Sequence, residues 1–261
     1  DDPAIRDGRT GIAYGSSSGS VDPVRIFGHM LESGSMQGVT STSYIQMMPH
    51  TTAVNVGLFF GLKGRVIPTS SACTSGSQGI GYAYEAIRFG RQTIMLAGGA
   101  EEISAPGAAV FDTLFATTCR NDSPTTTPRP FDRDRDGLVV GEGAATLVLE
   151  DYEHAKARGA KILAEIVGYG TSGDAYHMTS GAEDGNGAGR AMKIALRQAG
   201  IQPSDVQHLN AHATSTPVGD LGEINAIKTL FGTDGQADYW SEAQAEANSF
   251  GSEITVTKRV W

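Results

Sequence analysis

The first half of the chain alternates short apolar runs with stretches of helical periodicity. Residues 65–72 form an apolar run that ends in small residues, and residues 93–99 form a continuous apolar run typical of a buried strand. Between them, apolar side chains recur at helical spacing over residues 80–89. We therefore predict a strand–helix–strand unit with parallel strands and a right-handed crossover. Three further elements are predicted upstream: a strand entering a Gly/Ser loop over 10–20, and helices over 24–31 and 44–61.

The second half of the chain repeats this order of elements. The pattern predicts a buried strand pair over 137–150, a surface helix over 151–159, a strand over 162–169, a helix over 187–200, a strand over 206–211 and a helix over 222–231. Each half then places candidate functional groups at the carboxyl end of a strand. This is an α/β arrangement in which ligands bind outside those strand ends.

Cys73 is the first candidate functional residue. The predicted elements place it on a strand-to-helix turn, among small residues that leave room for an acyl group. The unpaired N–H groups and positive end of the helix should stabilise the thiolate, so we expect a nucleophile at neutral pH. Cys119 lies in a polar segment without this context, and we interpret it as an incidental thiol.

His212 is the second candidate, because it follows a predicted strand and precedes a polar loop. Its imidazole can donate a hydrogen bond to an oxygen that gains negative charge. Thr214 and Thr216 alternate, so both hydroxyls are expected to face one groove and bind an amide-containing ligand arm. Asp220 and Glu223 lie where a helix begins, and capping of that helix is the simpler interpretation of both.

Composition excludes several classes of protein. The chain has 261 residues, 39% of them hydrophobic, and a net charge of −9 without a basic run, so we expect no nucleic-acid partner. No apolar stretch is long enough for a membrane span, and the first residues are not a signal sequence, so a cytoplasmic enzyme is the default. Two widely separated cysteines indicate free thiols rather than a disulfide framework or a zinc site.

Several motifs, in order and at matching spacing, carry a family resemblance. They are ACTSG at 72–76, AGGAE at 97–101, RDG at 135–137, DAYHMTS at 174–180 and NAHATSTPVGD at 210–220. From about residue 10 to residue 231, the chain resembles the β-ketoacyl-[acyl-carrier-protein] synthases. The resemblance implies a thiolase-like fold, with two related halves in α-β-α-β-α layers over 1–161 and 162–261, and a homodimer.

The resemblance also implies a reaction, the decarboxylative Claisen condensation of fatty-acid elongation. Cys73 would take an acyl group from a carrier-protein thioester, and His212 would stabilise the enolate formed when malonyl-carrier protein loses CO2. Thr214 and Thr216 would hold the phosphopantetheine arm of the acyl carrier protein. Glu223 and Asp220 would support the site, and Phe111 and Met178 are candidates for the acyl pocket. No metal and no cofactor beyond the carrier's phosphopantetheine is implied.

The sequence departs from the family pattern near its end. A Lys-x-x-x-Gly-His segment should follow residue 231, but the five other histidines all precede His212. Residues 247–251 resemble the start of the family's glycine loop, and 254–260 resemble its final strand. We therefore expect internal gaps near 232–240 and 251–252, and a start inside the first half. A competing interpretation takes 256–258 as the lysine segment, cut short.

The surface that docks the carrier protein is less clear from the sequence. Carrier proteins are acidic, so a basic patch is expected on the synthase. Residues 30–42 contain no basic residue, which leaves Lys63 and Arg65 as docking candidates.

Four alternatives are weighed from the sequence. A polyketide-type ketosynthase would share the Cys and His geometry, and a chain-length-factor-like partner subunit would usually lack the cysteine. A thiolase would need a second cysteine late in the chain, and Cys119 lies in the wrong half. A Rossmann enzyme is only weakly indicated, because no ordered G-x-G-x-x-G motif is present.

Overall fold

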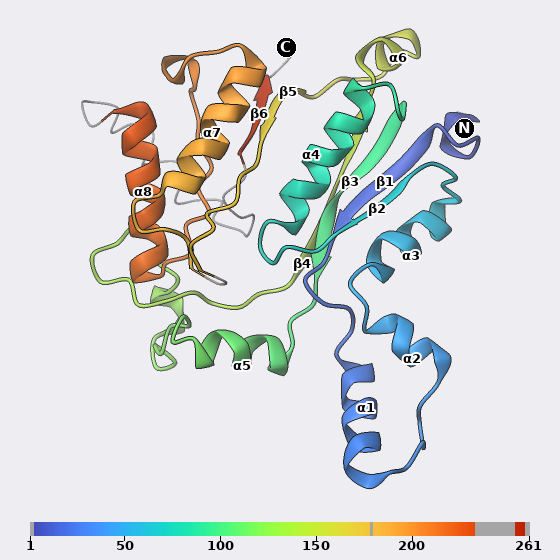
Figure 1. Cartoon of the computed structure of the whole chain (residues 1–261), viewed down its shortest axis with the longest axis vertical. Helices are drawn as coiled ribbons and strands as arrows, with labels where there is room; N and C mark the ends of the chain where they lie inside the picture. Colours follow the sequence, from blue (N-terminus) through green and yellow to red (C-terminus); the bar gives the residue numbers. More distant parts are fainter. Residues whose placement is uncertain (1–2, 178–179, 233–253, 259–261) are drawn as a thin grey trace. The chain divides into compact units, whose positions relative to one another are not determined.

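The computed structural model describes residues 3–177 and 180–232 and the backbone of 254–258. They pack into two compact units, one of residues 1–106 and 141–163 and the other of residues 107–140 and 164–261. The strands are β1 (Thr10–Gly15), β2 (Val66–Thr69), β3 (Ile94–Glu101), β4 (Gly143–Glu150), β5 (Glu165–Gly170) and β6 (Ile254–Lys258) (Figure 1). The α-helices are α1 (Asp22–Ser33), α2 (Ser41–Gln46), α3 (Thr51–Phe60), α4 (Ser75–Arg88), α5 (Ala105–Thr113), α6 (Tyr152–Ala157), α7 (Asn186–Ala199) and α8 (Pro217–Phe231).

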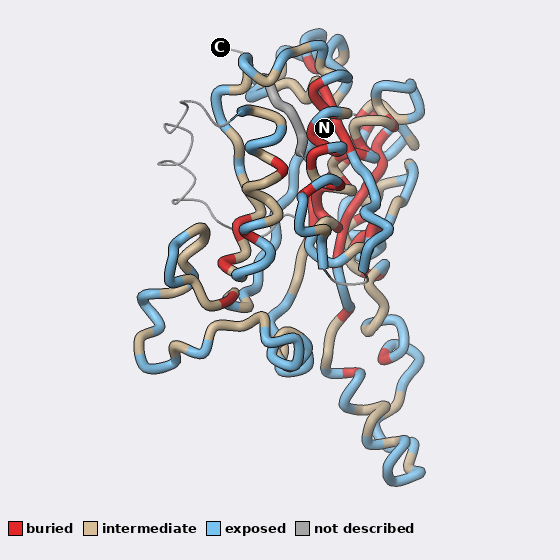
Figure 2. Tube along the Cα trace, turned by 60° about the vertical axis from the view of Figure 1, so that its left-hand side comes forward, coloured by how far each residue is buried: buried red, intermediate tan, exposed pale blue. Residues whose placement is uncertain are grey.

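The first unit is built on a four-stranded sheet in the order β2-β1-β3-β4. β1 pairs in parallel with both β2 and β3, and β4 runs antiparallel to β3. Because side chains alternate between the faces of a strand, Ala13 packs under α4 while Ile12 and Tyr14 pack on the other face, with Ala53 of α3. The buried positions of this unit therefore concentrate on β1, β3 and α4 (Figure 2).

Three predicted elements of the first unit differ in the structure. The two strands that flank α4 are parallel as predicted, but they are not neighbours, because β1 lies between them. The predicted buried pair over 137–150 is the single strand β4, and most of its residues are exposed. The predicted helix over 44–61 is instead two helices, α2 and α3, separated by a turn at residues 47–50.

The second unit packs α7 against β5, which also pairs antiparallel with β6. Tyr169 is buried in this unit, and Gly168 and Gly170 let the strand approach the α7 backbone so closely that a Cβ at either would collide with it. Residues 206–211 form no strand, contrary to prediction, and α8 begins at Pro217 rather than at residue 222. Thr216 caps this helix, and proline at its first position fits the helix start.

The described units are discontinuous in sequence, since residues 107–140 belong with the C-terminal part of the chain. The predicted division into halves at residue 161 stays a prediction. No described helix is long and apolar enough to cross a membrane.

Two helical glycines of the first unit should respond oppositely to alanine. A Cβ at Gly28 of α1 meets nothing within 4 Å, whereas a Cβ at Gly79 of α4 would lie 2.8 Å from the Ala13 carbonyl oxygen. Gly28→Ala should raise the free energy of unfolding by about 0.5–1 kcal/mol through helix propensity. Gly79→Ala should lower it by about 1–3 kcal/mol through overpacking against β1. Urea denaturation measures both, and equal effects would contradict this packing of α4 on the sheet.

Candidate active site

Cys73 lies on the turn that joins β2 to α4, as predicted. Thr74 is the N-cap residue of α4, and Ala72 has a positive φ of 51°, a strained conformation for a residue other than glycine. The residue is exposed and its thiol is free. The turn therefore presents the cysteine at the carboxyl end of a sheet strand and at the start of a 14-residue helix.

Serine and threonine side chains fix this turn. The Ser75 hydroxyl accepts a hydrogen bond from the Ser71 N–H at 2.8 Å and donates one to the Ala72 carbonyl at 2.7 Å. The Thr74 hydroxyl donates to the Ser71 carbonyl at 2.8 Å. Small polar residues around a nucleophile thus satisfy the backbone of a turn that has no regular secondary structure.

The electrostatics of Cys73 differ from the prediction of a stabilised thiolate. Loss of water around the sulfur raises the pKa of the thiol, and the Glu101 carboxylate raises it further, whereas a hydrogen bond from the backbone of Cys73 itself lowers it. The net shift of the Cys73 pKa is upward, so the prediction that the start of the helix lowers this pKa is wrong. Desolvation of the thiolate and its repulsion by the Glu101 carboxylate outweigh the stabilisation that the backbone hydrogen bond provides.

The His212 loop is held by a carboxylate. The two oxygens of Glu223 accept hydrogen bonds from the backbone N–H groups of His212, at 2.7 Å, and Ala213, at 2.9 Å. Ala213 and Ser215 both have positive φ values, 51° and 66°, which requires such external support. Glu223 therefore stabilises the loop that carries the histidine rather than the helix start alone.

Burial lowers the pKa of His212, while the negative charges of Glu223 and Asp220 oppose this shift. The net shift is downward, so the neutral imidazole is the favoured form at neutral pH. Its Nδ1 atom is buried and has no hydrogen-bond partner among the described residues. A neutral ring still carries one N–H that can be donated to a substrate oxygen.

Thr214 and Thr216 point to the same side of this loop, as predicted, because their hydroxyl oxygens are hydrogen-bonded at 2.8 Å. The Thr216 hydroxyl also accepts the N–H of Gly219 at 3.1 Å, which caps α8. The Thr216 hydroxyl is therefore already hydrogen-bonded to the first turn of α8. Their contact with a pantetheine arm stays a prediction.

Asp220 has a larger structural role than helix capping. Its side chain is 1% exposed and accepts the N–H groups of Ser215 at 3.0 Å and Phe131 at 2.7 Å. Arg135 forms an ion pair with it at 3.4 Å and also donates to the Thr216 carbonyl at 3.2 Å. The carboxylate thus fastens the segment around residues 129–137 to the loop that follows His212.

Sequence analysis quoted Arg135 only as part of a motif and missed this role. The signal that it offered was an arginine in the charged RDRDG segment at 133–137, two residues before a glycine. Neither feature identifies the partner, because Asp220 lies far away in the sequence.

The remaining candidates are placed as follows. Phe111 lies half-buried on α5, and Cys119 is exposed in the segment after that helix. Met178 lies outside the described residues, as do the predicted glycine-loop start at 247–251 and the expected gap near 251–252. The expected gap near 232–240 lies outside them from residue 233 onward. Cys73 belongs to the first unit, and His212, Thr214, Thr216, Asp220 and Glu223 belong to the second.

Comparison with known proteins identifies relatives of this chain. Residues 1–155 match the family model described as "Beta-ketoacyl synthase, N-terminal domain", and residues 163–246 match "Beta-ketoacyl synthase, C-terminal domain". Among curated relatives, 3-oxoacyl-[acyl-carrier-protein] synthase 2 of Vibrio cholerae is 46% identical over 87% of this chain and 55% of its own length. The mitochondrial 3-oxoacyl-[acyl-carrier-protein] synthase of Arabidopsis thaliana is 43% identical over 85% of this chain and 49% of its own length.

Solved structures show the same relationship. A β-ketoacyl synthase from Burkholderia phymatum is 65% identical, with a TM-score of 0.86 over 88% of this chain and 56% of its own. A type II polyketide ketosynthase, solved with its acyl carrier protein, is 35% identical, with a TM-score of 0.78 over 89% of this chain and 59% of its own.

The fold and the two motif loops are those of the thiolase-like class of proteins. The chain belongs to the β-ketoacyl synthase family, as its two family matches and its relatives show. It spans about half the length of the curated relatives that it matches.

Replacing the buried carboxylate of Asp220 should destabilise the second unit strongly. Asp220→Asn leaves Arg135 without its counter-ion and turns an amide toward backbone N–H donors, so we expect a loss of about 3 kcal/mol in the free energy of unfolding. Glu183→Gln, at an exposed position of the same unit, is the matched control and should change it by less than about 0.5 kcal/mol. Similar values for both variants in urea denaturation would show that Asp220 does not hold these segments together.

Proposed function

We propose that this chain carries out acyl transfer to Cys73 as part of a β-ketoacyl-acyl-carrier-protein synthase that elongates fatty acids. The observation that carries the proposal is the cysteine at the β2–α4 turn, in a chain whose curated relatives are named 3-oxoacyl-[acyl-carrier-protein] synthases. We expect the reaction in the cytoplasm. The chemistry is supplied by side chains and by the thioester itself, with phosphopantetheine arriving on the carrier protein.

In the first half-reaction the Cys73 sulfur attacks the carbonyl carbon of the acyl thioester. The new C–S bond forms as the bond to the pantetheine sulfur breaks, and the carrier leaves as a thiol after taking up a proton. Because burial and the Glu101 carboxylate raise the pKa of the Cys73 thiol, we propose that its proton leaves as attack begins.

In the second half-reaction malonyl-carrier protein loses CO2, and the electron pair of the broken C–C bond forms an enolate. The enolate carbon attacks the acyl carbonyl, and the Cys73–acyl bond breaks to release the β-ketoacyl product. The neutral His212 ring donates its N–H to the enolate oxygen, where negative charge develops. Glu223 fixes the backbone of His212, and the hydroxyls of Thr214 and Thr216 bind the amides of the pantetheine arm.

The acyl carrier protein is the proposed protein partner. A related polyketide ketosynthase was solved in complex with its acyl-carrier protein, and the thioester substrate requires such a carrier here. Lys63 and Arg65 are both exposed in the segment before β2. Arg65 also lines the surface proposed below for the homodimer, which leaves Lys63 as the candidate for docking the acidic carrier surface.

A polyketide-type reaction is the second candidate function. Three similar structures are polyketide-related or ketosynthase–chain-length-factor assemblies, at 26–35% identity. Retention of Cys73 favours the catalytic subunit over the chain-length-factor-like partner. The acyl chain that the enzyme prefers distinguishes the fatty-acid reaction from the polyketide reaction.

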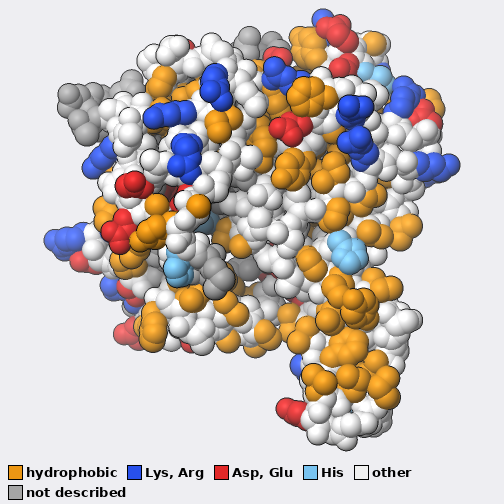
Figure 3. Space-filling model, in the orientation of Figure 1, with side chains coloured by type: hydrophobic (Ala, Val, Ile, Leu, Met, Phe, Trp, Pro, Cys, Tyr) orange, Lys and Arg blue, Asp and Glu red, His pale blue; other side chains and the backbone are white. Residues whose placement is uncertain are grey.

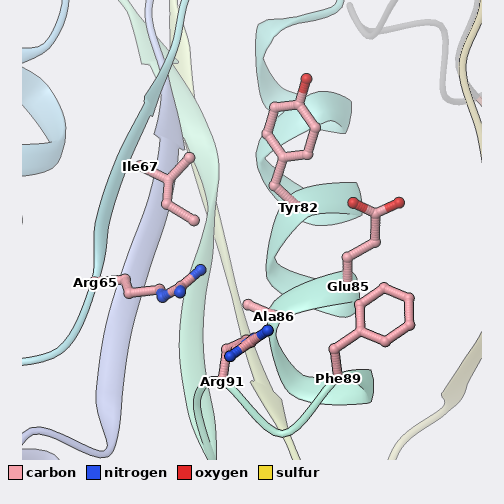
Figure 4. A pocket seen from close by; sticks show the side chains of 7 residues that line it. All are labelled: Arg65, Ile67, Tyr82, Glu85, Ala86, Phe89 and Arg91. Atoms are coloured by element: carbon pink, nitrogen blue, oxygen red, sulfur yellow. The ribbon is translucent and has the colours of Figure 1, made fainter.

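We infer that the protein forms a homodimer through the β2 edge of its first unit. β2 is an outer strand of the sheet, so its outer backbone edge lacks a neighbouring strand within the described residues. Beside it lies a cavity of about 300 Å³ between β2 and α4, lined by Arg65, Ile67, Tyr82, Glu85, Ala86, Phe89 and Arg91 (Figure 4). The cavity combines arginines, a glutamate and exposed aromatic rings, a composition that can pair with a second copy of itself.

A second exposed apolar surface of this unit is available to a partner subunit. Exposed hydrophobic side chains gather over α1, α2 and the segment between them (Figure 3). Leu31 is 79% exposed and Met36 is 66% exposed. Apolar clusters of this kind typically mark protein–protein contacts.

The condensing reaction should depend on Cys73 and not on Cys119. The substrates are the acyl thioester and the malonyl thioester of acyl carrier protein. With both present, Cys73→Ser should lower the rate of β-ketoacyl product formation by at least about 100-fold, because the hydroxyl is a far weaker nucleophile. Cys119→Ser is the matched control and should retain the rate of the unmodified chain. Equal rates for the two variants in a product assay by mass spectrometry would refute the proposed nucleophile.

The dimer proposal predicts that a charge at the β2–α4 surface lowers self-association. Phe89→Glu should raise the dimer dissociation constant by about tenfold or more in sedimentation equilibrium, since it places a charge on an aromatic contact. Leu163→Glu, at an equally exposed position, should not change it, with exposures of 69% for Phe89 and 72% for Leu163. A monomer at all concentrations, or equal weakening by both changes, contradicts the proposed interface.

A further inference from the structure

Glu101 lies where three parallel strands of the first unit end. It is the last residue of β3, and the register aligns Gly99 of β3 with Gly15 of β1, which in turn aligns with Thr69 of β2. Cys73 follows β2 by a few residues. The carboxyl ends of β1, β2 and β3 therefore bring Glu101 and the nucleophile to the same edge of the sheet.

The carboxylate of Glu101 holds the loop that leaves β1. It accepts the N–H of Ser17 at 2.7 Å and the hydroxyl of Ser18 at 3.4 Å. From the other side, the N–H of Ser16 donates to the carbonyl of Thr69 at 3.2 Å. The loop 16–18 is thus fastened between the end of β3 and the strand that leads to Cys73.

The packing between this loop and the cysteine turn leaves little freedom. A Cβ at Gly15 would lie 2.5 Å from the carbonyl carbon of Ser75, the first residue of α4. Since Ser75 also forms the hydrogen bonds of the Cys73 turn, a displacement of the end of β1 would be transmitted to that turn. Glu101 thereby acts on the nucleophile through neighbours in direct contact.

Glu101 also acts on Cys73 through its charge. Its carboxylate raises the pKa of the Cys73 thiol, in the same direction as desolvation. The adjacent Glu102 is turned to a different part of the chain, where its carboxylate accepts the N–H of Val21 at 2.8 Å. The loop 16–21 carries no charged side chain, and α4 carries none before Glu85, far along the helix from Cys73.

We propose that Glu101 is a positioning residue for the Cys73 nucleophile, which places a carboxylate at the strand end beside the cysteine turn and fastens the loop 16–18 there. The role of Glu101 in acyl transfer rests on the proposed function. Its geometry belongs to the first unit alone.

The test is the pH dependence of iodoacetamide alkylation of Cys73 in the full chain, followed by peptide mass spectrometry. Glu101→Gln keeps an oxygen for the Ser17 N–H but removes the charge. We expect the midpoint of the alkylation profile to move to lower pH and the rate at pH 7 to rise by about twofold or more. Glu102→Gln removes an equal charge one residue away and should leave the profile in place, and Cys119 provides an internal reference.

A second measurement uses the unmodified chain. Higher salt screens the Glu101 carboxylate, so the midpoint should fall with ionic strength in the unmodified chain and much less in Glu101→Gln. An unchanged midpoint in Glu101→Gln, an equal shift in Glu102→Gln, or a profile insensitive to salt in the unmodified chain would overturn the proposal. A shifted midpoint in a chain that accepts no acyl group from carrier protein would instead support the role of Glu101 and refute the proposed function.

Discussion

The parallel pairing of β1 with both β2 and β3 is the interaction on which the candidate nucleophile depends. It aligns the ends of three strands, so the loop after β1, the cysteine turn after β2 and the carboxylate at the end of β3 meet at one edge. The absence of a side chain at Gly15 lets α4 start directly against β1. The helix, the turn and the nearby negative charge are consequences of that register.

The loop that carries His212 in the second unit is stabilised in a different way. Among the described residues no strand pairs with this loop, and two carboxylates support it. Glu223 binds the backbone of His212 and Ala213, and Asp220 binds Ser215 and, with Arg135, a distant segment. Both carboxylates are on α8, whose first residues follow the loop directly. Charged groups thus replace sheet hydrogen bonds as the support of a strained segment, and burial keeps the imidazole neutral.

Local patterns predicted most elements and the cysteine turn correctly, because periodicity and turn residues act over short stretches of chain. The position of Cys73 before α4 and the paired hydroxyls of Thr214 and Thr216 follow from such patterns. The same patterns failed for residues 137–150, which form the single exposed strand β4, and for residues 206–211, which form no strand. Apolar composition alone does not say which partner a strand has. The pKa direction of Cys73 and the Arg135–Asp220 pair depend on contacts between distant residues, which no local pattern contains.

The central claim is that Cys73 accepts the acyl group, and covalent transfer tests it most directly. The full chain is incubated with a short-chain acyl thioester of acyl carrier protein, and its intact mass and tryptic peptides are measured. The account predicts one acyl group per chain, on the peptide that contains Cys73, removable by hydroxylamine as expected for a thioester. Absence of any acyl adduct, or an adduct on Cys119 with Cys73 unmodified, would contradict it.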